Sequence, residues 1–141
     1  MANPGPATTV TSNYPTIGNN QALVRIAAYK GLPLSSAGDI AIPIDGPISA
    51  FVPTVVVTTN ANVTCATATV GIYTAPAQGG TAVLTTAALT GQTTTAFAYV
   101  RAATAVAAQV TAATSGVLYA NIGTTVASAT VDLYLYGYNV S

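Results

Sequence analysis

The sequence has very few side chains that carry charge, and none that titrate near neutral pH. Its 141 residues include three Lys and Arg, three acidic residues, all of them Asp, and no His. Charged residues make up 4% of the chain, whereas soluble domains usually have about 25%. The charges also sum to zero. Because nucleic acids and charged membrane surfaces attract proteins through a field of one sign, neither is an expected partner.

Cysteine is nearly absent as well, which excludes one way of stabilising a small domain. The single cysteine, Cys65, cannot form a disulfide framework. Since no His is present to activate its thiol, we expect Cys65 to be a small buried side chain and not a nucleophile. A chain of this length can bury about 70% of its unfolded surface, so hydrophobic burial alone can stabilise it.

No residue pattern is typical of a catalytic, cofactor or metal site. General acid–base chemistry uses His, Glu, Asp, Lys or Cys in contact with one another, and the chain has only three carboxylates. We interpret these as turn residues that accept hydrogen bonds from backbone amides. We therefore expect no enzymatic activity, no cofactor and no metal. The basic residues are expected to pair with carboxylates: Arg25, Lys30 and Arg101 with Asp39, Asp45 or Asp132.

Apolar residues, in contrast, are plentiful. They make up 51% of the chain, and the mean hydropathy is +0.55. No run of about 20 apolar residues is present, as a membrane-spanning helix requires, so a membrane is not an expected partner. From Gly46 to Val100 no residue is charged, so the surface must be neutral. Because a net charge near zero promotes association, the protein is expected to function in an assembly.

The N-terminal segment, Met1 to Gln21, differs from the remainder of the chain. It is rich in Pro, Gly and Asn and shows no apolar periodicity, which predicts an extended arm preceding a β-domain at 22–141. Within the arm, Tyr14 and Ile17 are candidate residues for contact with a protein partner. The first residues lack the positive and apolar regions of a signal peptide, so synthesis in the cytoplasm is expected.

Alternation of apolar and polar residues predicts about eight strands in the β-domain. Short strands separated by turns favour an all-β sandwich or barrel, and eight strands suit a two-sheet jelly roll, so we predict an antiparallel β-sandwich of jelly-roll type. Pro43 should lie in an edge strand. The Ala-rich stretch 102–113 is consistent with either a short helix or a loop. The expected strands are Ala22–Tyr29, Gly38–Ile44, Thr54–Thr59, Val63–Tyr73, Thr81–Leu84, Phe97–Arg101, Val117–Ile122 and Thr130–Val140.

The last expected strand carries a row of aromatic residues. Tyr134, Tyr136 and Tyr138 alternate with Leu133 and Leu135, so the Leu side should enter the core and the Tyr side should point outward. Such Tyr rings can lie across neighbouring strands of their own sheet. A large exposed aromatic surface, however, is typical of a contact with a partner. We predict that these three Tyr form a protein interface.

Several stretches carry a further signal: Lys30–Leu34 before Ala37–Pro43, Gly71–Ala75 before Gly79–Val83, and Ala129–Gly137. Together with the Pro/Gly/Asn-rich start, they resemble the capsid decoration, or cement, proteins of tailed bacteriophages. The resemblance implies a jelly roll that forms a homo-oligomer, either a dimer or a trimer, and binds the major capsid protein on the outside of the virion. The alternative is a carbohydrate-binding β-sandwich of a virion fibre or surface adhesin, in which the Tyr row would stack on sugar rings.

Overall fold

Strand β9 (Thr130–Asn139) illustrates how alternation in the sequence builds the core. Leu133 and Leu135 are fully buried, whereas Tyr136 is half-buried and Tyr138 is 40% exposed. Successive side chains of a strand point to opposite faces, so one face of β9 enters the interior and the other is directed outward. The orientation predicted for the Leu and Tyr rows is confirmed.

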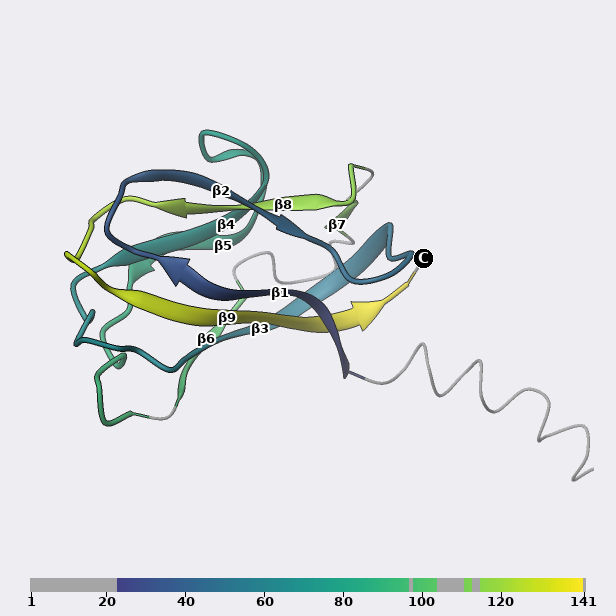
Figure 1. Ribbon diagram of the computed structural model, residues 1–141. Coiled ribbons are helices and arrows are strands. Elements are labelled where there is room, and N and C mark those ends of the chain that lie inside the picture. Colours follow the sequence, from purple (N-terminus) through teal and green to yellow (C-terminus); the bar gives the residue numbers. More distant parts are fainter. Residues whose placement is uncertain (1–22, 97, 104–110, 113–114, 141) are drawn as a thin grey trace, which may run out of the picture.

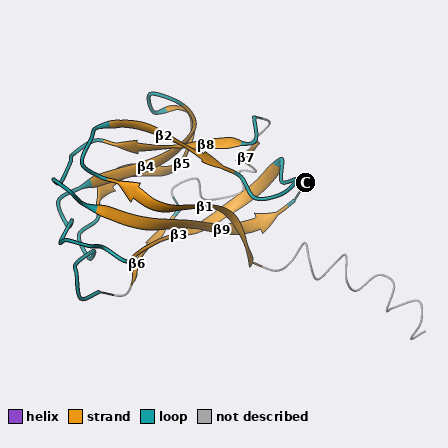
Figure 2. Cartoon of the chain, in the orientation of Figure 1, coloured by secondary structure: helices purple, strands orange, loops and turns teal. Residues whose placement is uncertain are grey.

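The computed structural model describes residues 23–96, 98–103, 111–112 and 115–140, which form nine strands and no helix (Figure 1, Figure 2). The predicted arm at 1–21 lies outside these residues. The remaining strands are β1 (Leu23–Pro33), β2 (Gly38–Pro43), β3 (Ala50–Thr59), β4 (Thr69–Ala75), β5 (Gly79–Ala88), β6 (Ala98–Ala102), β7 (Thr111–Ala112) and β8 (Val117–Ile122).

The strands form two antiparallel sheets packed face to face, as Figure 1 shows. Sheet A has the order β1-β9-β3-β6, and the two-residue β7 also pairs with β3. Sheet B has the order β2-β8-β4-β5. The fold is therefore an antiparallel β-sandwich, as predicted. Pro43 ends β2, an edge strand, which is also as predicted.

Strands distant in the sequence pair in a nested order. β4 pairs with β5, β3 with β6, β2 with β8, and β1 with β9. The chain is thus folded like one long two-stranded ribbon whose tip is the β4–β5 turn. In that turn the amide of Gly79 donates to the carbonyl oxygen of Pro76 at 3.1 Å, and Ala77 and Gln78 both have positive φ. Positive φ at both central residues is typical of the tight turns that join antiparallel strands.

The core lies between the two sheets and receives apolar side chains from both. Phe51 on β3 and Leu135 on β9 enter it from sheet A, and Ile72 on β4 and Leu118 on β8 enter it from sheet B. All four are fully buried. Burial of a side chain of this size contributes about 1.5–3 kcal/mol, so these contacts are a main source of stability.

The two sheets are joined along the β1–β2 side of the sandwich. Ala27 and Ile44 form an isolated antiparallel bridge, and the Asp45 amide donates to the Ile26 carbonyl oxygen at 2.7 Å. The side chain of Arg25 on β1 also forms an ion pair with Asp45. Pairing of Arg25 with a carboxylate was predicted, and it is confirmed.

On the opposite side, Arg101 of β6 links the sheets without a carboxylate partner. Its guanidinium donates to the carbonyl oxygens of Val70 at 2.9 Å, Thr85 at 2.9 Å and Ala87 at 3.3 Å, all in sheet B. Burial lowers the pKa of Arg101. The prediction that Arg101 pairs with an Asp is wrong, because its side chain faces inward, where carbonyl groups of the irregular β4–β5 pair are within reach.

Two strand predictions also need correction. The strand expected at Val63–Tyr73 begins only at Thr69, because the preceding residues turn back: the amide of Ala68 donates to the carbonyl oxygen of Cys65 at 3.0 Å. Cys65 therefore lies in a turn and not in a strand, but it is fully buried, as predicted, and burial raises the pKa of its thiol. The described residues form nine strands and not eight, because β7 is added. Most of the 102–113 stretch lies outside them.

Candidate interaction surface

The outward side chains of sheet A form a largely apolar surface, which we call the tyrosine face. It comprises the three Tyr of β9 and the outward residues of the adjoining strands. In the antiparallel register, each Tyr is adjacent to a Val of β3. The pairs are Tyr138 with Val52, Tyr136 with Val55, and Tyr134 with Val57. The other outward residues are Leu23, Arg25 and Ala28 of β1, Thr59 of β3, and Ala98, Val100 and Ala102 of β6.

Exposed hydrophobic side chains concentrate on the tyrosine face. Among the described residues, four large hydrophobic side chains are exposed, and three of them belong to this face: Leu23 at 49%, Val100 at 58% and Tyr138 at 40%. The fourth, Val140, follows the end of β9. Contiguous apolar surface of this kind on a sheet commonly marks a site of contact with another molecule.

The charges around the tyrosine face are balanced. Arg25 is opposite Tyr136 in the register, and both the hydrogen bond to Asp45 and the charge of Asp45 raise the pKa of Arg25. At the other end of β9, Asp132 accepts hydrogen bonds from the Gly31 amide at 2.8 Å and from Asn60 Nδ2 at 2.9 Å. Lys30 is exposed at that same end. The face therefore presents little net charge to a partner.

The outer face of sheet B has a different chemistry. Asn121 of β8 donates through Nδ2 to Asp39 Oδ1 at 2.8 Å and accepts at Oδ1 from Gln78 Nε2 at 2.9 Å. The second oxygen of Asp39 accepts from the Ala77 amide at 2.7 Å. The bond from Asn121, followed by that from Ala77, lowers the pKa of Asp39. These polar groups bind one another and fasten the β4–β5 turn to the sheet.

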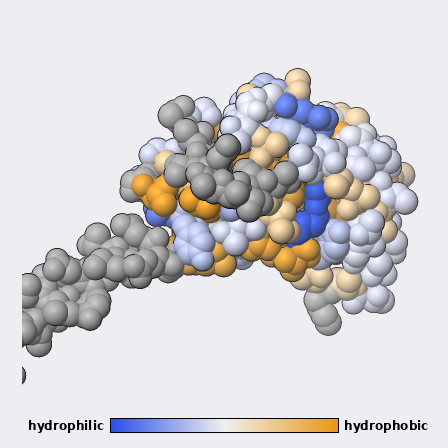
Figure 3. Space-filling view, turned by 180° about the vertical axis from the view of Figure 1, so that it is seen from behind, coloured by the Kyte–Doolittle hydropathy of each residue, from blue (hydrophilic) through white to orange (hydrophobic). Residues whose placement is uncertain are grey.

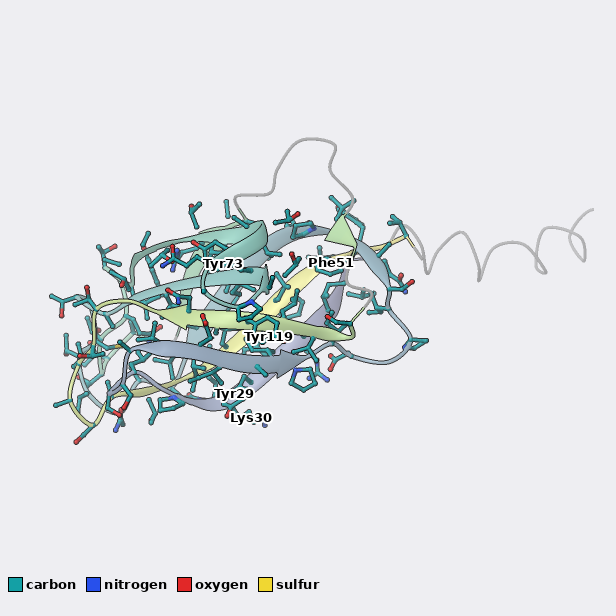
Figure 4. All side chains as sticks on the ribbon, turned by 90° about the horizontal axis from the view of Figure 1, so that it is seen from above. Tyr29, Lys30, Phe51, Tyr73 and Tyr119 are labelled. Atoms are coloured by element: carbon teal, nitrogen blue, oxygen red, sulfur yellow. The ribbon has the colours of Figure 1, made fainter. Side chains whose placement is uncertain are left out.

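Tyr73, on the same outer face, is covered by its own sheet. Figure 4, which looks down on sheet B, shows Tyr73 on β4 and Tyr119 on β8. The Tyr73 hydroxyl lies 3.0 Å from Thr86 Oγ1 and accepts from the Thr86 amide at 3.2 Å. A Cβ at Gly71 would lie 2.8 Å from the Tyr73 ring, so the ring occupies the space that this glycine leaves. Tyr73 is consequently only 6% exposed.

A buried polar pair that the sequence did not indicate lies inside the sandwich. Thr58 Oγ1 donates to Gln92 Oε1 at 2.6 Å, and the Gln92 carbonyl oxygen accepts from the Cys65 amide at 3.2 Å. Both Thr58 and Gln92 are at least 98% buried. Gln92 is in a loop, with Gly91 before it and Thr93 after it, so nothing in its local sequence distinguishes it from a solvent-exposed glutamine.

The remaining surface of the described residues carries few charged groups. Figure 3 shows one side of the molecule, on which pale, weakly polar residues dominate and hydrophilic blue is confined to small areas. In the part of the chain that the structure describes, no pocket is found and no three His, Cys, Asp or Glu side chains gather as metal ligands would. Nor do those residues include a helix long and apolar enough to cross a membrane.

The structure thus brings three of the five predicted interface residues together on one surface. Tyr134, Tyr136 and Tyr138 line the tyrosine face. Tyr14 and Ile17 lie outside the described residues, so their predicted contact role stays a prediction. Comparisons with protein-family models, with curated proteins and with solved structures found no match to this chain. What defines the protein is its class: an all-β sandwich with one apolar and one polar outer face.

Proposed function

We propose that this protein is a structural virion protein that binds the outer surface of an icosahedral bacteriophage capsid and stabilises it. The observation that carries the proposal is the tyrosine face, where large apolar side chains stand exposed with little net charge. Tyr side chains supply a large contact area at low cost in conformational entropy and are common at the centres of protein interfaces. Such a surface fits permanent attachment to other subunits.

The strand order supports a jelly-roll topology, which accords with the resemblance to capsid decoration proteins. Apart from the two-residue β7, eight strands remain, four in each sheet, and they pair in nested order around the β4–β5 turn. A jelly roll is a double sheet of eight strands built from two Greek keys. Because one fold serves many functions, the topology supports the proposal only by analogy.

In this proposal the partners are the major capsid protein and further copies of the chain. The protein is made in the bacterial cytoplasm and resides on the capsid exterior. The uncharged segment at 1–21 supplies additional contacts through Tyr14 and Ile17. A role of this kind requires no titratable group, which fits a chain in which Asp39 and Asp132 accept hydrogen bonds and Asp45 forms an ion pair.

Occupancy on purified phage particles, measured by gel densitometry, tests the proposal. With few charges to screen, binding should survive concentrated salt and weaken in mild denaturant. The Tyr136→Ala variant should lower occupancy, because truncating an interface aromatic costs about 2 kcal/mol, or about thirtyfold in affinity. Tyr119→Ala, on the outer face of sheet B, is the matched control. Release by moderate salt, or full occupancy with Tyr134, Tyr136 and Tyr138 each replaced, would contradict the proposal.

A second candidate function, carbohydrate binding in a virion fibre or adhesin, is favoured by one observation. Planar polar side chains lie beside an aromatic ring on sheet B, because Asn121 and Tyr119 point outward from the same strand. However, Asn121 already donates to Asp39 and accepts from Gln78, so a sugar would have to displace these bonds. Titration of the labelled protein with mono- and oligosaccharides, followed by NMR, tests this function through shifts at Tyr119 or at the tyrosine face.

A further inference from the structure

We propose that the tyrosine face binds the tyrosine face of a second copy of this chain, forming a two-fold symmetric dimer. The inference rests on the proposed function, in which the tyrosine face holds the protein in an assembly, and it assigns that face to a second copy, so that Tyr136→Ala lowers occupancy on particles by weakening the dimer. Three properties of the face lead to this partner: its relief, its charge and its size.

The tyrosine face has one raised part and one low part, and each fits the other part of a second copy. The Tyr side chains of β9 form a ridge, and β6, two strands away, presents a low shelf of Ala98, Val100 and Ala102. The Val side chains of β3 lie between the ridge and the shelf. A two-fold axis parallel to the strands and passing over β3 places the ridge of each copy over the shelf of the other. Such a contact buries large side chains against small ones, as in the aligned packing of two sheets.

The register defines which residues meet in this arrangement. Val57 is paired with Tyr134 on one side and with Val100 on the other, so these residues lie at one level of the sheet. At the next outward position, Val55 has Tyr136 and Ala102 as its neighbours. Since the two-fold axis preserves the level, Tyr134 of one copy opposes Val100 of the other. By the same geometry, Tyr136 opposes Ala102.

The charge distribution permits two copies to approach. Arg25 belongs to β1, which lies outside the β9-β3-β6 region and therefore at the rim of the contact, and Asp45 neutralises it within the same copy. Lys30 and Asp132 have opposite signs and lie at one end of the face. Like charges are thus not forced together at the centre of a symmetric interface, where repulsion is costly.

The size of the face is sufficient for a weak contact. Strands β9 and β3, with ten residues each, and β6, with five, lie about 4.8 Å apart and rise about 3.3 Å per residue, so they present on the order of 400 Å² from each copy, or about 800 Å² in total. This area is below the range of stable interfaces and fits a weak, reversible dimer. Leu23, which is paired with Tyr138 and belongs to β1, lies at the rim of this contact.

Sedimentation velocity on the full-length chain, without any capsid, tests the inference. The unmodified chain should form a dimer, and Val100→Asp and Tyr134→Asp should each weaken it at least about tenfold. Ala41→Asp places the same charge on the exposed outer face of sheet B and should leave the dimer unchanged. Circular dichroism and thermal unfolding establish that each variant folds. Val100 is 58% exposed in the single chain, so its replacement should be tolerated.

A mixing experiment tests the ridge-over-shelf arrangement itself. The Tyr134→Asp and Val100→Lys variants should each self-associate poorly, whereas an equimolar mixture should form a heterodimer, because one unmodified contact and one opposite-charge pair are present. A monomeric unmodified chain, an equal effect of Ala41→Asp, or no association in the mixture would overturn the inference. Loss of the dimer on deleting residues 2–20 would instead assign the contact to that segment.

These outcomes remain distinct from those of the capsid experiment. A monomeric chain that still occupies phage particles overturns the dimer and leaves the proposed function intact. A dimer that fails to bind particles overturns the proposed function and leaves the dimer.

Discussion

The two outer faces of the sandwich use tyrosine in opposite ways. On sheet B, Tyr73 lies over Gly71, bonds to Thr86 and is 6% exposed. On sheet A, Tyr138 stands next to Val52 and Leu23 and is 40% exposed. The difference lies in the neighbours, since Gly71 leaves space that the Tyr73 ring occupies, whereas both register partners of Tyr138 carry side chains. A ring covered within its own sheet stabilises the single chain, and an uncovered one is available to a partner.

The largest expected effect comes from truncating one Tyr on each face. Tyr73→Ala should lower the free energy of unfolding by about 3–5 kcal/mol, as for other buried aromatic residues. Tyr138→Ala should change it by less than about 1 kcal/mol, because an exposed side chain contributes little within one copy. Urea unfolding of dilute protein, followed by circular dichroism, measures both. Equal losses would abolish the distinction between the faces.

The next effect concerns Arg101, which attaches β6, and with it the shelf of the tyrosine face, to sheet B. Arg101→Ala removes three hydrogen bonds to carbonyl oxygens and should lower the free energy of unfolding by about 1.5–3 kcal/mol. It should also weaken self-association, because β6 loses its anchor. The control is Val100→Ala, the outward neighbour, which should leave unfolding nearly unchanged. Unaltered stability in Arg101→Ala would show that the link is dispensable.

A smaller loss is expected when the space beneath Tyr73 is filled. In Gly71→Ala, the new Cβ would lie 2.5 Å from Thr86 Oγ1 and 2.8 Å from both the Thr86 backbone nitrogen and the Tyr73 ring. Overpacking of this kind costs about 1–3 kcal/mol. In a Tyr73→Ala background the cost of Gly71→Ala should fall, because the ring is no longer an obstacle, and a double-mutant cycle measures the difference. Additive effects would argue that the ring does not depend on this glycine.

The smallest effect concerns pH and the polar face. Hydrogen bonds from Asn121 and Ala77 lower the pKa of Asp39 in the folded chain. Asp39 therefore stabilises the fold above the ordinary Asp pKa of about 3.9, and this contribution is lost as pH falls through the lowered folded value. Asp39→Asn should be slightly less stable than the unmodified chain at neutral pH, and the gap in melting temperature should close in strong acid. A gap of constant size would contradict this assignment.

Local patterns in the sequence predicted much of the architecture. The strand expected at Val117–Ile122 coincides with β8, and the alternation in the last strand correctly separated Leu133 and Leu135 from the Tyr row. Alternation predicted a strand wrongly at Val63–Ala68, where the chain turns back and Cys65 and Ala68 are buried while Thr64 and Thr67 are exposed. The sequence also indicated the Tyr residues of the candidate surface, but not the shelf on β6 beside them.

The sequence by itself determined the features that depend on adjacent residues. These are the alternation of inward and outward side chains in the strands, the low charge and the burial of Cys65. Only the tertiary structure decided which distant residues meet. It joined Asp39, Gln78 and Asn121 in one hydrogen-bonded row, and it gave Arg101 carbonyl partners instead of a carboxylate. The physical reason is that the alternation of side chains is set within a strand, whereas the partners of a residue on other strands depend on the register between the strands. A shift of one residue in that register moves every side chain of a strand to the opposite face of the sheet.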